Sequence, residues 1–334
     1  MPASLEQYRQ ACTDTLRSLL QDFRLPLYDM MRYHLGWLDS SGAPAAAYAG
    51  KALRPALCLM ACDALCGSYR PALPAAAAIE LLHNYSLVHD DVQDGDRERR
   101  GRPTVWSLWG KAQAINVGTA MRILANLALH RLELPPAKLL RIQDCLDRAT
   151  LRLIEGQYLD ISFEQRAAVA ADEYLQMIRG KTAALIAASL QVGALIGCDD
   201  PQMARRFHEL GLALGMAFQI RDDILGIWGD SAATGKPTGS DLVRRKKTYP
   251  IVCAWEKADR RKAERLRRMF RRARPRETGH LAAILEELGC RAAAQELVER
   301  YSAEALEKLK DFGFPPEVFS RFASMISALR SRSA

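Results

Sequence analysis

The feature that most constrains the fold is a set of long segments that are apolar on most of their faces. Four of them cover residues 75–92, 105–130, 183–196 and 203–227. Helical periodicity recurs in nearly every other segment, and no convincing alternating strand is evident. Helices that are apolar all round must be surrounded by other helices. The pattern therefore predicts an all-α fold, one large helical bundle that forms a single domain over residues 1–334.

The first of these segments ends in a row of carboxylates, "HDDVQD". Asp90 and Asp94 are four residues apart, which on a helix places both on one face. Two such carboxylates repel each other unless a cation lies between them, and the C-terminal end of a helix disfavours negative charge. Mg²⁺ is commonly held by one or two carboxylates together with substrate phosphates. A metal site is therefore one interpretation of this motif, and a solvated helix end is the other.

A second acidic pair lies inside another apolar segment, "MAFQIRDDILGIW", which contains Asp222 and Asp223. Buried acids are costly unless they are paired or bound to metal. Basic side chains, which complement phosphate oxygens, recur in the three pieces "GKALRP", "RGKTAAL" and "TGKPTGSDLVRRKK". Together the motifs favour an apolar cavity with a Mg²⁺-bridged diphosphate at its rim.

Six motifs carry a resemblance to a known family: "GKALRP", "LLHNYSLVHDDVQD", "RRGRPT", "GKT", "FQIRDD" and "TGKPTGSDL", in this order over roughly residues 50–250. They resemble the trans-isoprenyl diphosphate synthases of the polyprenyl synthetase family. The resemblance implies an isoprenoid synthase-type bundle around a deep apolar cavity, a homodimer, and about three Mg²⁺ ions per active site. It also implies head-to-tail condensation of isopentenyl diphosphate with dimethylallyl, geranyl or farnesyl diphosphate.

The resemblance further implies roles for individual residues. The expected metal ligands are Asp90, Asp94 and Asp222. The expected isopentenyl diphosphate ligands are Lys51, Arg54, His83 and Arg100. The expected allylic diphosphate ligands are Arg99, Lys181, Thr182, Gln219, Lys236 and Lys246. Of these, Lys181, Thr182 and Gln219 are the catalytic candidates. The oxygens of Thr182 and Gln219 are expected near the allylic cation. Asp96, Arg97 and Arg102 receive no role and are interpreted as a solvated loop.

The sequence departs from the family pattern at two places. Gly226 stands where a further aspartate often lies, which predicts one metal rather than two on that wall. Residues 244–245 are Arg-Arg where a glycine often precedes the lysine, so the choice of Lys246 over Lys247 rests on alignment alone.

Product length is predicted from the residues just before the first aspartate motif. Tyr85 lies five residues before Asp90, roughly one and a half turns deeper, and a large side chain there would form a floor for the growing chain. Ser86 beside it is small. In the family this combination resembles geranylgeranyl diphosphate synthases, and farnesyl diphosphate synthases less closely.

Other functions remain open at this level. A class I terpene cyclase would share the fold and the first motif, but it needs no isopentenyl diphosphate clamp and usually lacks "QIRDD". A helical metal-dependent phosphohydrolase would explain His83, His89 and Asp90, but not the basic pieces. A non-catalytic regulatory subunit would not need the intact aspartates and arginines.

Charge and cysteine content address location and partners. Residues 256–276 hold eleven Lys/Arg and three Asp/Glu, an excess that equals the net charge of +8 for the whole chain. We interpret this segment as a solvated helix. The alternative is a weak contact with an anionic membrane surface. Because no aromatic residues are interleaved with the basic ones, the segment does not predict nucleic-acid binding.

There is neither a secretory signal nor a long apolar run, and we expect a cytoplasmic protein with reduced thiols. Cys58, Cys62 and Cys66 are interpreted as core residues.

Overall fold

Helices make up nearly all the regular structure in the residues that the computed structural model describes. These residues are 3–45, 50, 52–230, 238–271, 274 and 277–331. The chain divides into two units, the first made of Met1–Thr150 with Ala188–His208 and the second of Leu151–Ala187 with Glu209–Ala334. Each unit therefore combines two separate stretches of the chain.

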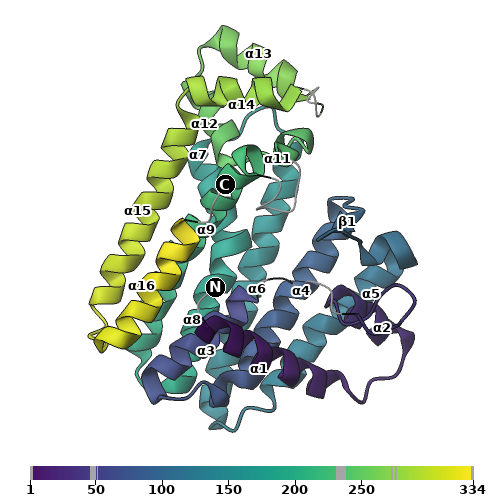
Figure 1. The fold of residues 1–334 in the computed structure, drawn as a ribbon, viewed down its shortest axis with the longest axis vertical. Coiled ribbons are helices and arrows are strands. Elements are labelled where there is room, and N and C mark those ends of the chain that lie inside the picture. Colours follow the sequence, from purple (N-terminus) through teal and green to yellow (C-terminus); the bar gives the residue numbers. More distant parts are fainter. Residues whose placement is uncertain are drawn as a thin grey trace. The chain divides into compact units, whose positions relative to one another are not determined.

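The first unit contains the N-terminal helices and one small hairpin. Its elements are α1 (Ala3–Leu20), α2 (Pro26–His34), α3 (Leu53–Cys66), the 3₁₀ turn η1 (Arg70–Ala72), α4 (Leu73–Gln93), β1 (Glu98–Arg99), β2 (Arg102–Pro103) and α5 (Val105–Leu129). Helix α4 packs against α5, α3 and α1, and α2 packs against α5 (Figure 1). The helix that carries the first aspartate motif is thus the central one of this unit.

The sequence of α4 explains its central position. Pro74 stands in the first turn, where its missing N–H costs no hydrogen bond. The four alanines 75–78 are fully buried, as are Ile79 and Leu81, so small side chains let neighbouring helices approach closely. Since each buried leucine or isoleucine contributes about 1.5–3 kcal/mol, this face fixes how α4 packs.

The second unit contains the C-terminal helices. Its elements are α7 (Ala171–Ile178), the π-helical turn η2 (Arg179–Ala183), α11 (Ser240–Val243), α12 (Tyr249–Lys257), α13 (Arg260–Arg271), α14 (Thr278–Glu287), α15 (Cys290–Lys310) and α16 (Pro316–Arg330). Three long helices, α6 (Pro136–Glu164), α8 (Ala184–Gly197) and α9 (Pro201–Trp228), contribute residues to both units. Helix α12 is buried from Pro250 to Trp255 and packs against α7 and α15, which makes it the core of this unit.

The observed helices confirm the predicted all-α fold. The four apolar segments correspond to α4, α5, α8 and α9, with ends that differ from the prediction by at most two residues. The hairpin of β1 and β2 was not predicted, because two-residue strands leave no periodic pattern in a sequence. The single domain remains a prediction.

One helical run among the described residues has the length and hydropathy of a membrane span. It covers Ala171–Gly197, and 72% of its most apolar window is buried within the protein. A buried core helix has the same character, so this run is weak evidence for a span.

All eight cysteines are free thiols; Cys58 and Cys62 are buried in α3, and Cys66 is exposed at its end.

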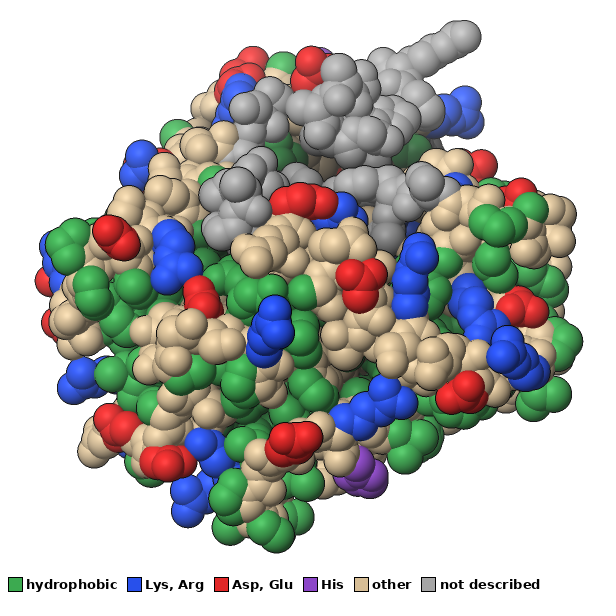
Figure 2. All heavy atoms as spheres, turned by 60° about the horizontal axis from the view of Figure 1, so that its bottom comes forward, with side chains coloured by type: hydrophobic (Ala, Val, Ile, Leu, Met, Phe, Trp, Pro, Cys, Tyr) green, Lys and Arg blue, Asp and Glu red, His purple; other side chains and the backbone are tan. Residues whose placement is uncertain are grey.

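The basic helix α13 uses its apolar side within the second unit. Ala263, Leu266 and Phe270 are buried, and the Phe270 ring packs edge-on against Trp255 with centroids 5.9 Å apart. Its cations Arg261, Lys262 and Arg268 are exposed. On the face shown in Figure 2, by contrast, side chains of both charges are scattered singly among hydrophobic ones.

Candidate active site

The aspartates of the first motif lie in the last turn of α4. Asp94 is the C-cap residue, and its N–H donates to the carbonyl oxygen of Asp90 at 2.7 Å. Gly95 follows with φ of 70°, and the N–H of Asp96 donates to the carbonyl oxygen of Asp91 at 3.0 Å. A glycine in the left-handed conformation ends the helix here. Asp94, which is exposed, lies one helical turn after Asp90.

Asp91, the second aspartate of the doublet, points the other way. It is 1% exposed, and Arg99 Nε donates to its Oδ1 at 2.7 Å. Burial raises the pKa of Asp91 to about 6, although the Arg99 guanidinium acts to lower it. Successive helical residues are rotated by about 100°, which is why adjacent aspartates have different surroundings. Asp91 therefore holds Arg99 in place, and this ion pair uses one of the five N–H donors of that arginine.

The "RRGR" sequence forms a tight hairpin. Arg99 pairs with Arg102 across β1 and β2, and the turn residues Arg100 and Gly101 have φ of 54° and 73°. Two positive φ values are typical of a type I′ turn, and a non-glycine residue there costs about 1–2 kcal/mol. The turn brings the Arg100 guanidinium onto the backbone of Gly50, where a Cβ would lie 2.6 Å from Arg100 Nη2. Gly50 therefore leaves the space that Arg100 occupies.

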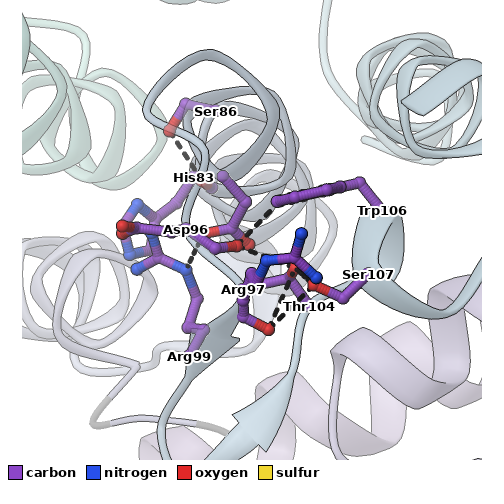
Figure 3. Close-up of polar contacts among 9 residues, drawn as sticks. His83, Ser86, Asp96, Arg97, Arg99, Thr104, Trp106 and Ser107 are labelled. Atoms are coloured by element: carbon purple, nitrogen blue, oxygen red, sulfur yellow. Dashed lines mark hydrogen bonds and ion pairs between the residues drawn. The ribbon is translucent and has the colours of Figure 1, made fainter. Parts of the chain in front are cut away.

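Side chains on the far side of the hairpin hold its base. The carbonyl oxygen of Asp96 accepts hydrogen bonds from Thr104 Oγ1 at 2.9 Å and from Trp106 Nε1 at 2.7 Å (Figure 3). Ser107 Oγ donates to the carbonyl oxygen of Arg97 at 2.9 Å. These bonds tie the loop to the start of α5.

The interpretation of a solvated loop is wrong for Arg102. Its guanidinium donates to the carbonyl oxygens of Tyr33 at 3.1 Å and Leu38 at 2.7 Å. It also lies 4.0 Å from the centroid of the Tyr33 ring, within the range of a cation–π interaction. Arg102 therefore joins the hairpin to α2 and the segment that follows α2.

Two of the predicted isopentenyl diphosphate ligands, Arg54 of α3 and His83 of α4, lie in contact. Arg54 Nη1 lies 3.3 Å from His83 Nε2. Burial lowers the pKa of His83 well below its usual value, and the nearby charges of Arg54 and Arg100 lower it further. The imidazole is therefore neutral at physiological pH. One turn before it, burial raises the pKa of Glu80, whose Oε1 accepts from Asn84 Nδ2 at 2.9 Å.

In the second unit, Lys181 and Thr182 lie in the π-helical turn η2 between α7 and α8. Single π-helical turns are rare and occur frequently at functional sites. Lys181 Nζ donates to Asp160 Oδ2 of α6 at 2.5 Å. Gly156, one turn before Asp160, lies against the lysine, since a Cβ there would be 2.7 Å from the Lys181 Cα. Close packing on α6 thus fixes the direction of the Lys181 side chain.

A chain of hydrogen bonds continues from Thr182. Its Oγ1 donates to Gln219 Oε1 at 2.7 Å, and Gln219 Nε2 donates to Asp223 Oδ1 at 3.0 Å. The Tyr174 hydroxyl and the N–H of Tyr249, at 3.1 Å, donate to the other oxygen of Asp223. Burial nevertheless raises the pKa of Asp223 to about 7. Its neighbour Asp222 is exposed, so this doublet is divided in the same way as Asp90 and Asp91.

The two adjacent lysines after α11 also have different surroundings. Burial alone would lower the pKa of Lys246, but carboxylates outweigh it and raise this pKa; they belong to Asp241, Asp160, Asp223 and Asp222. Lys247 Nζ donates instead to the carbonyl oxygen of Arg166 at 2.6 Å and lies 5.9 Å from the Trp255 ring centroid. The geometry therefore puts Lys246 among the acidic residues and Lys247 in the core.

Gly226 gives space to another carboxylate. A Cβ at this position would lie 2.5 Å from Cγ of Asp241, which comes from the "GSD" sequence at the start of α11. The position that lacks an aspartate on α9 therefore has the Asp241 carboxylate beside it.

The oxygen donors of this acidic group suit a hard divalent cation. Its four carboxylates are those of Asp160, Asp222, Asp223 and Asp241, against the two amines of Lys181 and Lys246. Within the described parts of the chain, no three acidic, histidine or cysteine side chains converge as a ready metal cage. Mg²⁺ often takes only one or two protein carboxylates and completes its shell with phosphate and water. The donor set therefore fits Mg²⁺ that arrives with a diphosphate.

The structure divides the predicted residues between the units. The first unit holds Arg54, His83, Tyr85, Ser86, Asp90, Asp94, Arg99 and Arg100, and the second holds Lys181, Thr182, Gln219, Asp222 and Lys246. Lys51 and Lys236 lie outside the described residues. Their roles stay predictions.

Sequence reasoning missed three residues beside the predicted ones, namely Asp160, Tyr174 and Asp241. Asp160 had a signal, because it is a single acid in the mostly apolar stretch "GQYLDISF". Asp241 lay within the quoted "TGKPTGSDL" but received no role. Tyr174 had no signal, since a tyrosine in an amphipathic helix is ordinarily a packing residue.

Comparison with known proteins identifies the family. The polyprenyl synthetase family model matches residues 37–288. A geranylgeranyl diphosphate synthase of Mycobacterium tuberculosis is 44% identical over 257 residues, 75% of this chain and 72% of the relative. A (2E,6E)-farnesyl diphosphate synthase of Mycobacterium bovis is also 44% identical, over 86% of this chain and 77% of the relative.

Solved structures agree over almost the full length. A polyprenyl synthetase from Streptomyces coelicolor A3(2) superposes with a TM-score of 0.92 at 39% identity, with 98% of each chain covered. A geranylgeranyl pyrophosphate synthetase from Pyrococcus horikoshii gives a TM-score of 0.90 at 32% identity, over 99% of this chain and 98% of that one. The helical fold, the ordered motifs and these matches together establish that the chain belongs to the polyprenyl synthetase family.

Proposed function

We propose that the chain condenses isopentenyl diphosphate head-to-tail with allylic diphosphates, as a Mg²⁺-dependent short-chain prenyl diphosphate synthase. The observation that carries the proposal is that the first unit has two different sets of side chains suited to a diphosphate. One set would hold it through Mg²⁺, and the other would hold it directly. The carboxylates of Asp90 and Asp94 lie one turn apart at the end of α4, whereas the cationic Arg54 and Arg100 lie near the neutral His83. The reaction needs two different sets of ligands, because one diphosphate must leave its substrate and the other must stay attached.

The allylic diphosphate must leave and the isopentenyl diphosphate must stay. Asp90, Asp94 and Asp222 would hold Mg²⁺, which when bound neutralises charge on the leaving diphosphate. Lys181 and Lys246 stabilise the same developing charge, because preorganised cations act most strongly where water is excluded. Arg54, His83 and Arg100, with Lys51, hold the second diphosphate through hydrogen bonds and charge alone, so its C–O bond is not activated.

The hydrogen-bond chain of the second unit supports a further role for Thr182 and Gln219. Gln219 Oε1 accepts from Thr182 Oγ1 while its Nε2 donates to Asp223, so the amide orientation is fixed. The hydroxyl oxygen and the amide oxygen are then held as dipoles that can stabilise a nearby allylic cation. The released diphosphate can take the proton lost after attack, so no side chain needs to act as a strong base.

Incubation with Mg²⁺, labelled isopentenyl diphosphate and each allylic starter tests this function. We expect elongation of at least one starter, its loss in excess EDTA, and its recovery when Mg²⁺ is restored, because the carboxylates cannot replace the ion. Chain-length analysis of the products is the measurement. Diphosphate hydrolysis without condensation would favour a phosphohydrolase, release of a cyclic hydrocarbon would favour a terpene cyclase, and no elongation of any starter would refute the synthase.

We propose geranylgeranyl diphosphate as the main product and farnesyl diphosphate as the alternative, since relatives of both names are 44% identical to this chain. Replacing Tyr85 with alanine is expected to lengthen the product, because it removes the large side chain one and a half turns below Asp90. Tyr85→Phe keeps the ring and should keep the wild-type product. An unchanged product spectrum in Tyr85→Ala would mean that Tyr85 is not the floor.

We also propose a homodimer, which exposed apolar side chains support. On α5 these are Leu108, Ile115, Ile123 and Leu127, each 39–55% exposed. On α6 they are Leu151, Ile154, Tyr158 and Ile161, which are spaced three, four and three residues apart and are 36–71% exposed. Rows of this kind on monomeric proteins mark interaction sites.

We propose that residues 1–334 form one domain, because the family match over 37–288 includes residues of both units. A cytoplasmic location is also proposed. A contact of 256–276 with an anionic membrane would depend on charge alone, because α13 buries its apolar side chains.

A further inference from the structure

Below the first aspartate motif, three residues of the first unit form a packed group across α4 and α5. Tyr85 and His89 lie on one face of α4, and their rings meet edge to face with centroids 5.0 Å apart and planes at 72°. His89 Nε2 lies 3.2 Å from the carbonyl oxygen of Ile115 on α5. The imidazole therefore bridges the tyrosine ring and the neighbouring helix.

Gly118 of α5 makes room for that imidazole. A Cβ at position 118 would overlap the His89 ring, since it would lie 3.3 Å from Cγ and closer still to the two ring atoms Cδ2 and Nε2. Gly118 is buried in the middle of a helix, where glycine costs about 1 kcal/mol relative to alanine. The contact with His89 gives a physical reason for a glycine at this costly position.

Burial and two charged groups affect the hydroxyl end of Tyr85. Burial raises the pKa of the Tyr85 phenol, with Arg122 of α5 acting to lower it and Asp90 to raise it further. Arg122 is itself held, because its Nη1 donates to Asn126 Oδ1 at 2.7 Å and its Nη2 pairs with Asp147 of α6. The edge-to-face contact with His89 sets the orientation of the Tyr85 ring.

We infer that His89 and Gly118 are positioning residues for product length: Gly118 admits the His89 ring, and that ring fixes the Tyr85 side chain that stops the growing prenyl chain. The inference rests on the proposed synthase function and extends it to residues that do not contact the diphosphates. It also gives His89 a role in the synthase, for which the family resemblance implied none.

Gly118→Ala tests the inference by pushing the His89 ring away from α5. We expect the ratio of longer to main product to rise about fivefold, roughly what one pair of edge-to-face rings contributes, with total consumption of isopentenyl diphosphate little changed. His89→Ala removes the same contact without overfilling the interface, so it should give the same shift and serves where Gly118→Ala does not fold. Thr119→Ala, an exposed change at the next position of α5, is the matched control and should keep the wild-type product.

The decisive test repeats the Gly118→Ala substitution in the Tyr85→Ala variant, because the effects of substitutions at residues that act through one another do not add. Adding Gly118→Ala to Tyr85→Ala should cause no further lengthening. A further shift in that background, or a wild-type product ratio in both Gly118→Ala and His89→Ala, would overturn the inference while wild-type elongation leaves the synthase function intact. If the wild-type chain elongates no starter, the synthase function itself fails.

Discussion

Replacing Lys246 with methionine is expected to lower kcat/KM for condensation by about 10²–10³-fold, the usual effect of removing one preorganised group that stabilises developing negative charge. Its amine is half-buried among the carboxylates of Asp241, Asp160, Asp223 and Asp222, which raise its pKa and keep it protonated at any physiological pH. Methionine keeps the length of the side chain and removes the charge. Steady-state kinetics with the preferred starter measure the effect.

Lys247→Met is the matched control, because the two lysines are adjacent and differ in surroundings. Lys247 donates to the carbonyl oxygen of Arg166 and lies near the Trp255 ring. Its loss removes a hydrogen bond from a charged donor, which contributes about 1.5–3 kcal/mol. We therefore expect a lower Tm with kcat/KM within severalfold of wild type. If Lys247→Met lost activity and Lys246→Met did not, the assignment of the two lysines would be reversed.

Much of the fold followed from the sequence because the central helices are apolar on most faces. The segments that became α4, α5, α8 and α9 each supply several fully buried apolar side chains, and a bundle buries such helices. The hairpin after α4 could not be predicted in the same way. It depends on positive φ at Arg100 and Gly101 and on the bonds that Thr104 and Trp106 make to its base, and none of these has a periodic signature.

The candidate site was predictable at the level of motifs and less so at the level of partners. Spacing placed Asp90 and Asp94 on one helix face and the family resemblance added Asp222, but the sequence could not show that Arg99 would pair with Asp91. It also passed over Asp160 and Asp241, because each is a single acid whose neighbours come from other helices. Partners that are distant along the chain are set by packing, and packing is what a single sequence does not specify.

Replacing Asp90 with asparagine is expected to lower kcat/KM by about 10³-fold, since a metal that neutralises a leaving group contributes several kcal/mol to the transition state. Asp90 and Asp94 follow each other by one turn at the end of α4, and asparagine keeps the shape while it removes the charge. The same variant should bind Mg²⁺ more weakly in the presence of an unreactive diphosphate. Calorimetric titration measures that binding independently of turnover.

Asp91→Asn, one residue along, separates the metal role from a structural one. Asp91 is buried and paired with Arg99, whose side chain is 27% exposed. Breaking a fully buried pair costs about 3–5 kcal/mol, and partial exposure of Arg99 reduces this to about 1–3 kcal/mol. We therefore expect Asp91→Asn to lower Tm and to weaken the hold on Arg99, while its Mg²⁺ affinity stays near that of wild type. Equal losses of Mg²⁺ affinity in Asp90→Asn and Asp91→Asn would contradict the division of the doublet, because rotation along α4 directs only Asp90 toward the same face as Asp94.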